Sequence, residues 1–171
     1  FLNKFIKATE FAAYGASPFI GKGNKTAADQ GAVDMMRNVL NTIEMKGTIV
    51  IGEGEMDEAP MLHINEKVGK NIGPELDIAV DPLEGTTFTS KGLPNAFSVL
   101  AVAEKGNLLS APDTYMEKII IGKNLPKNLL DLDYGVKKNI KILSEAMNKK
   151  SSDLSACVMK RPRHAHIIKI L

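Results

Sequence analysis

The sequence predicts an α+β fold, in which two N-terminal helices precede a mixed, partly antiparallel sheet. As far as Ile43, apolar side chains recur at spacings of three and four, which is the period of a helix face packed on a core. Short apolar, β-branched runs bounded by glycine or proline follow, as expected of strands. One pair of runs, 96–103 and 108–111, flanks the turn 104–107 like a β-hairpin, so part of the sheet should be antiparallel.

Composition and charge limit the class of protein. The 171 residues are 44% hydrophobic, which is enough to build a core for one or two ordinary domains. The 22 basic and 20 acidic residues are spread along the chain, so the net charge of +2 calls for neither nucleic acid nor a membrane as partner. No apolar run approaches the roughly 20 residues of a membrane span, and no export signal is visible. The lone Cys157 excludes an internal disulfide, and we expect a buried thiol in a cytoplasmic protein.

Two helices are expected at the N-terminus, over 2–13 and 26–43, separated by Pro18 and the glycine-rich stretch 21–25. Asp29 is expected in the first turn of the second helix. Unpaired amide groups and the helix dipole favour a negative charge there, so the simplest role for Asp29 is to complement the helix end. The same geometry also suits a phosphate or a metal-held anion.

A first acidic turn follows the expected strand 48–51. Residues 52–58 are punctuated by glycine and contain four acids, among them Glu53 and Asp57. Such a run most often marks a solvated surface. Here it comes directly after a strand that should be buried, and α/β-type sheets present ligands to clefts at such strand ends. That position favours a functional role.

A second acidic turn follows the apolar strand 77–80. The proline after this strand cannot donate to a ladder, so the strand is expected to end at Asp81, and the next glycine allows a sharp turn. Clustered carboxylates repel one another and are usually stabilised by a hard divalent cation such as Mg²⁺, Mn²⁺ or Ca²⁺. The alternative is an acidic surface turn whose aspartate caps a helix that begins just beyond it. The side chains that can converge on this turn are Asp81, Glu84 and Thr86.

The remainder of the chain is expected to alternate short strands, loops and helices. Besides a loop at 67–74 and an irregular connection at 123–134, we expect strands at 61–64, 119–121 and 156–159 and helices at 136–147 and 165–171. Arg161 and Arg163 follow the last of these strands. They form either a solvated loop or an anion site, since a guanidinium group binds phosphate with two parallel hydrogen bonds. Tyr115 is interpreted as an ordinary half-buried aromatic residue.

Acids that bind metals together with arginines that bind anions favour phosphate-ester chemistry. The sequence also resembles a known family over nearly its whole length. Four segments, 47–61, 77–86, 111–118 and 161–164, resemble in that order the class II fructose-1,6-bisphosphatases of the bacterial GlpX type. The Asp-Pro-Leu-Glu-Gly-Thr motif is also similar to the wider lithium-sensitive superfamily of sugar and inositol phosphatases. The Gly-Glu-Gly-Glu and Ala-Pro-Asp-Thr-Tyr-Met-Glu-Lys motifs are more specific to GlpX.

The resemblance implies roles for individual residues. The acidic metal positions of the family, which would hold Mg²⁺ or Mn²⁺, match Asp29, Glu53, Asp81 and Glu84. The pair implicated in preparing the attacking water matches Asp57 and Thr86. Positions that hold the sugar bisphosphate match Thr86, Tyr115, Arg161 and Arg163. Arg161 stands where the family more often has lysine, which keeps the charge but changes the donor geometry.

The resemblance also implies an activity and an architecture. The activity is metal-dependent hydrolysis of fructose 1,6-bisphosphate to fructose 6-phosphate and phosphate, as in gluconeogenesis, by a homo-oligomer with the layered sugar-phosphatase fold. GlpX proteins are longer, and their second half supplies another acidic ligand. We therefore expect residues 1–155 to form the N-terminal sugar-phosphatase domain and residues 156–171 to begin a second, truncated α/β domain. The alternatives are another sugar or inositol phosphatase, such as a sedoheptulose-1,7-bisphosphatase, or an inactive metal- or phosphate-binding fragment.

Overall fold

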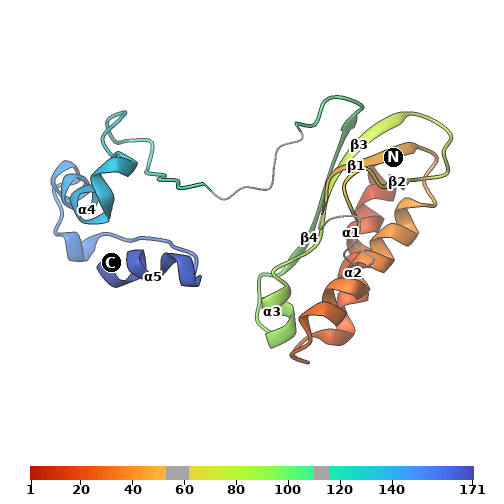
Figure 1. Cartoon of the computed structure of the whole chain (residues 1–171), viewed down its shortest axis with the longest axis horizontal. Helices are drawn as coiled ribbons and strands as arrows, with labels where there is room; N and C mark the ends of the chain where they lie inside the picture. Colours follow the sequence, from red (N-terminus) through yellow and green to blue (C-terminus); the bar gives the residue numbers. More distant parts are fainter. Residues whose placement is uncertain (53–61, 110–115) are drawn as a thin grey trace. The chain divides into compact units, whose positions relative to one another are not determined.

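The chain divides into two compact units, Phe1–Pro112 and Asp113–Leu171. The computed structural model, shown in Figure 1, describes residues 1–52, 62–109 and 116–171. The predicted domain boundary, between residues 155 and 156, falls within the second unit; it refers to the layered fold of the longer family and stays a prediction.

Two helices of the first unit, α1 (Leu2–Ala16) and α2 (Lys25–Leu40), pack against each other and against the sheet (Figure 1). A short 3₁₀ turn, Ser17–Phe19, follows α1. The helices approach closely where both carry glycine, since a Cβ atom added at Gly15 would lie 2.1 Å from the carbonyl oxygen of Gly31. Both predicted N-terminal helices are therefore confirmed, although the second ends before the predicted residue 43.

The sheet has four strands in the order β2-β1-β3-β4, and the predicted mixed, partly antiparallel sheet is confirmed. β1 and β3 are parallel, whereas β2 pairs with β1 and β4 with β3 in antiparallel fashion. β2 lies where a loop was predicted at 67–74, because so short a strand depends on its partner rather than on a pattern of its own. The strand bounds are β1 (Lys46–Ile51), β2 (Lys67–Val68), β3 (Glu75–Glu84) and β4 (Phe97–Glu104).

The core of the first unit lies between the two helices and the face of the sheet that they cover. Alternation along β3 places Ile78 and Val80 on this face, and both are buried. Partly buried residues of β4 extend the same cluster. The largest fully buried side chains of the core include Met36, Leu40, Ile43, Met45, Ile49 and Leu62.

Several predicted strands are not found in the described part of the chain. An apolar run forms a strand only with a hydrogen-bonded partner and a covered face, and Ile120, for example, is 91% exposed. Cys157 is also exposed, so the predicted burial of its thiol is wrong. Residues predicted as strand but found in turns or irregular chain are 62–64, 108–109, 119–121 and 156–159.

The second unit is built from short helices. Asn139 is buried, and its amide joins the Asp131 backbone twice, with Nδ2 donating to the carbonyl oxygen at 2.6 Å and Oδ1 accepting from the N–H at 3.2 Å. No helix in the described residues of either unit has both the length and the apolar character needed to cross a membrane. The helices predicted at 136–147 and 165–171 are confirmed as α4 (Gly135–Ala146) and α5 (Ala165–Ile170), and the 3₁₀ turns are Leu132–Tyr134, Ser151–Asp153 and Pro162–His164.

Candidate metal and phosphate site

The turn that carries Asp81, Glu84 and Thr86 begins inside a strand. The prediction that the strand ends at Asp81 is wrong, since β3 continues to Glu84 with a shift of register against β4 between these two residues. Pro82 lies in the shifted stretch. A proline is tolerated there because a residue in a bulge need not donate to the ladder.

Gly85 turns the chain from β3 into the short helix α3 (Thr86–Lys91). Its φ of 86° lies in the left-handed region that residues with a side chain rarely adopt. Among the described residues no side chain caps α3, so the alternative that an aspartate of this turn serves as its cap is wrong. Glu84, just before the turn, is exposed, and Thr86, just after it, is half-buried.

The carboxylate of Asp81 has one oxygen in an unfavourable place. Its Oδ1 atom is buried and has no hydrogen-bond partner among the described residues, as is also true of Ser98 Oγ on the neighbouring strand. Leaving a buried polar atom unpaired costs about 1–3 kcal/mol, and more when the group is charged. A hard divalent cation binds carboxylate oxygens and would remove this penalty. Asp81 therefore fits the metal that the family resemblance implies.

Asp29 lies on the second turn of α2, not on the first as predicted, because the helix already begins at Lys25. The helix is capped instead by Asn24, whose Oδ1 accepts a hydrogen bond from the N–H of Ala27 at 3.0 Å. Asp29 is half-buried, and this burial raises the pKa of its carboxyl group above the usual value. Since burial disfavours the charged form, a nearby cation would stabilise the Asp29 carboxylate.

The loop that leads into α2 is bound to α3 through main-chain hydrogen bonds. The N–H of Gly21 donates to the carbonyl oxygen of Thr89 at 2.9 Å, and the N–H of Gly23 donates to that of Ser90 at 2.8 Å. The helix that carries Asp29 thus lies beside the helix that follows the acidic turn (Figure 1). From the sequence, this glycine-rich stretch was interpreted only as a break between helices. Its Gly-Lys-Gly-Asn pattern was the feature of the sequence that could have indicated a close main-chain contact with α3.

The described residues do not by themselves complete a metal site. Among them, no three His, Cys, Asp or Glu side chains form a group that could hold a metal ion. The grouping of Asp29, Asp81 and Glu84 around one or more cations therefore stays a prediction. Three further predicted site residues lie outside the described residues: Glu53, Asp57 and Tyr115.

The two predicted anion-binding arginines belong to the second unit. Arg161 directly precedes the 3₁₀ turn Pro162–His164, Arg163 lies within it, and both are exposed. The main chain orients the next side chain, since Nδ1 of His164 lies 2.7 Å from the carbonyl oxygen of Met159. Because the second unit is described by itself, contact of these arginines with a sugar phosphate stays a prediction.

A hollow of the first unit lies away from these residues. It runs between the first half of α1 and strands β3 and β4, and apolar side chains such as Phe5, Leu76 and Leu100 line it. None of the predicted site residues contributes to its lining. The chemistry of the acidic turn, not the size of a groove, therefore identifies the candidate site.

Comparison with known proteins agrees with the motifs. A family model described as bacterial fructose-1,6-bisphosphatase, glpX-encoded, matches residues 1–171. The class 2 fructose-1,6-bisphosphatase of Haemophilus influenzae is 47% identical over 166 residues, which are 97% of this chain and 50% of that protein. Fructose-1,6-bisphosphatase 1 class 2 of Escherichia coli K12 is 47% identical over 165 residues, 96% of this chain and 49% of that protein. The chain thus spans about half the length of the curated relatives it matches.

Proposed function

Because the chain belongs to the family of bacterial, glpX-encoded fructose-1,6-bisphosphatases, we propose that the protein hydrolyses fructose 1,6-bisphosphate to fructose 6-phosphate and inorganic phosphate. This is the reaction of a phosphoric monoester hydrolase acting in gluconeogenesis. The 47% identity to two class 2 fructose-1,6-bisphosphatases supports this choice of substrate. The proposal includes a cytoplasmic location and a homo-oligomeric state.

The observation that carries the proposal is the buried, unpartnered Oδ1 atom of Asp81. It lies at the bulged end of β3, with Glu84 and Thr86 on the same short segment. Buried polar atoms are normally hydrogen-bonded, so an exception among acids and hydroxyls points to a missing ligand. A divalent cation with a phosphate ester suits this combination of carboxylate and hydroxyl groups better than a neutral ligand does.

Bound Mg²⁺ or Mn²⁺ would supply positive charge that neutralises the phosphoryl oxygens and lowers the pKa of a coordinated water. The residues proposed to hold the cations are Asp29, Glu53, Asp81 and Glu84. Thr86, oriented by Asp57, positions a water in line with the bond between phosphorus and the oxygen on sugar carbon 1. The water oxygen forms a new bond to phosphorus as the bond to the sugar oxygen breaks. The water loses one proton and the sugar oxygen takes one up, which gives the sugar hydroxyl and inorganic phosphate. The residues proposed to anchor the rest of the substrate are Tyr115, Arg161 and Arg163.

The Asp81→Ala variant tests the proposal in the protein expressed from its complete gene. We expect phosphate release from fructose 1,6-bisphosphate to fall by about 100-fold or more, since a misplaced reacting group alone costs that much. Calorimetric titration with Mn²⁺ should show loss of binding. Thermal unfolding without metal should show an unchanged or higher Tm, because the variant removes a buried, unpaired oxygen.

A matched control is Glu104→Gln, which changes an exposed acid at the end of the neighbouring strand β4 and should leave both readings unchanged. Metal-dependent turnover retained by Asp81→Ala would contradict the assignment. A panel of sugar and inositol phosphates, with sedoheptulose 1,7-bisphosphate among them, tests the substrate. Faster release from another member of the panel would replace fructose 1,6-bisphosphate as the substrate.

A further inference from the structure

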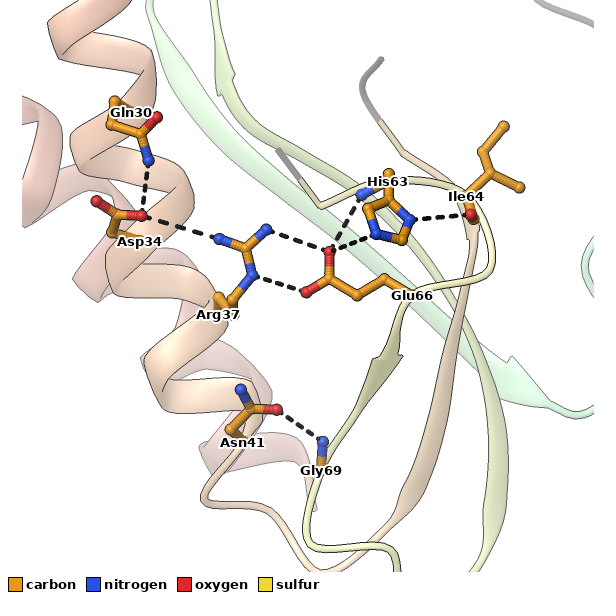
Figure 2. Close-up of polar contacts among 8 residues, drawn as sticks. All are labelled: Gln30, Asp34, Arg37, Asn41, His63, Ile64, Glu66 and Gly69. Atoms are coloured by element: carbon orange, nitrogen blue, oxygen red, sulfur yellow. Dashed lines mark hydrogen bonds and ion pairs between the residues drawn. The ribbon is translucent and has the colours of Figure 1, made fainter. Parts of the chain in front are cut away.

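An ion pair joins α2 to the segment through which the chain returns to the sheet before β2 (Figure 2). Arg37 Nε lies 2.7 Å from Glu66 Oε1, and Arg37 Nη2 lies 3.2 Å from Glu66 Oε2, so the guanidinium group donates to both carboxylate oxygens. The side chains are only 21% and 15% exposed. Such a two-pronged, largely buried pair is directional and little screened by solvent.

Neighbouring groups orient both members of the pair (Figure 2). Glu66 Oε2 also accepts a hydrogen bond from the N–H of His63 at 3.2 Å. Along α2, Asp34 Oδ1 lies 3.8 Å from Arg37 Nη1 and accepts a hydrogen bond from Gln30 Nε2 at 2.7 Å. Because each partner is held on a second side, the pair has a defined geometry rather than that of a mobile surface contact.

The segment that Arg37 holds is itself fixed to β1. The N–H of Ile49 donates to the carbonyl oxygen of Glu66 at 2.9 Å. Leu62 is fully buried, and a Cβ atom added at Gly52 would lie 2.1 Å from its carbonyl oxygen. Gly52 and Leu62, the described residues on either side of 53–61, therefore lie against each other.

We propose that Arg37 and Glu66 are positioning residues, whose ion pair fixes Gly52 and Leu62 relative to α2. The inference rests on the function proposed above, because one acid assigned to the cations, Glu53, directly follows Gly52 in the sequence and another, Asp29, lies on α2. Neither Arg37 nor Glu66 touches metal or substrate in this role. Ligands from separate elements must hold their geometry to within about 0.5 Å, so a looser link weakens metal binding and misplaces the attacking water.

A purely structural role for the pair predicts a different behaviour. Replacing both members of a buried ion pair with apolar residues of similar volume is often neutral or stabilising, whereas removing one leaves an unpaired charge. The double variant Arg37→Met/Glu66→Met therefore removes the directional link while preserving the packing. If the pair only stabilises the fold, this variant should bind metal and turn over substrate normally.

The experiment uses the protein expressed from its complete gene and compares this double variant with Glu75→Met/Lys105→Met. The control removes an ion pair of the same 2.7 Å length, which joins β3 to the turn after β4 and is 50% and 69% exposed. We measure Mn²⁺ affinity by calorimetry, kcat and KM for fructose 1,6-bisphosphate, and Tm. We expect Mn²⁺ affinity and kcat to fall by about 10- to 100-fold in the Arg37/Glu66 variant only, as is usual when groups that orient metal ligands are lost. KM should stay within a few-fold of wild type.

Each result decides the proposal. A folded Arg37/Glu66 double variant with wild-type Mn²⁺ affinity and kcat overturns it. If that variant does not fold, Arg37→Lys decides instead, because it keeps the charge but loses the two-pronged contact. Wild-type Mn²⁺ affinity in Arg37→Lys would also overturn the proposal. If wild type binds Mn²⁺ but releases no phosphate, the proposed function fails while the Mn²⁺ affinities still test positioning. Absence of Mn²⁺ binding by wild type overturns both.

Discussion

Two places at which the chain leaves or rejoins the sheet are held in different ways. At the end of β3, the path is set locally, by a register shift around Pro82 and by the left-handed conformation of Gly85. Where the chain returns towards β2, Glu66 is held by Arg37, which is 29 positions away in the sequence. The first device depends on adjacent residues and the second on a contact between separate elements. A change at Gly85 acts first on the end of β3 and on α3, whereas a change at Arg37 or Glu66 acts on the contact between α2 and the segment before β2.

The largest effect of a local change is expected for Gly85→Ala. A side chain in the left-handed conformation costs about 1–2 kcal/mol, which unfolding in urea should measure as lower stability. A Cβ atom here would also lie 3.1 Å from the ring of Phe88, so that ring must move by a few tenths of an ångström. Turnover of fructose 1,6-bisphosphate should fall as well, because Asp81 and Thr86 lie on either side of this glycine.

Gly106→Ala provides the matched control for that change. Gly106 has a nearly identical φ of 85°, with no atom within 4 Å of an added Cβ, and lies in the turn after β4. It should lose about the same 1–2 kcal/mol of stability and keep wild-type turnover. Equal turnover in the two variants would show that the geometry at Gly85 does not control the site.

A smaller effect is expected at α2, which contacts both α3 and the segment that contains Glu66. Asn24→Ala removes the side chain that caps α2 and should lower the free energy of unfolding by about 1 kcal/mol. Urea unfolding measures this change. The control Asp131→Ala removes the cap of a three-residue 3₁₀ turn in the second unit. An equal loss of stability in both variants would contradict a specific role of Asn24 in holding α2.

The smallest effect should be a pH-dependent one at Asp29. Burial raises the pKa of this carboxyl group above 3.8 in the folded chain, so its contribution to stability is fully present below the unfolded value and is lost as pH rises through the folded value. Without metal, Asp29→Asn should therefore be more stable than wild type at neutral pH, with the difference disappearing in acid.

Adding Mn²⁺ should reverse that order, since a ligand that binds only the folded protein stabilises it. Tm measured from pH 3 to 8, with EDTA and then with Mn²⁺, checks both parts. A Tm difference that does not change with pH would rule out titration of Asp29 as its source. Glu104→Gln, an exposed acid, should follow wild type throughout.

Features that depend on neighbouring residues could be predicted. Helical periodicity located α1 and α2, and the pairing of acids with a glycine located the turn at Gly85, because sequence spacing determines these features directly. Local rules failed where another element intervened. Pro82 did not end its strand, because pairing with β4 resumes at Glu84 beyond the shifted stretch. The isoleucine run 119–121 formed no strand, since no partner covers it in the described chain.

By itself, the sequence determined the family, the places of α1, α2, β1, β3 and β4, and the acids and hydroxyl at the end of β3 and the start of α3. These follow from residue types at short spacings. Only the tertiary structure decided that Asp81 Oδ1 is buried without a partner and that Arg37 meets Glu66. Burial and long-range pairing depend on which surfaces distant segments bring together, and no spacing within one segment contains that information.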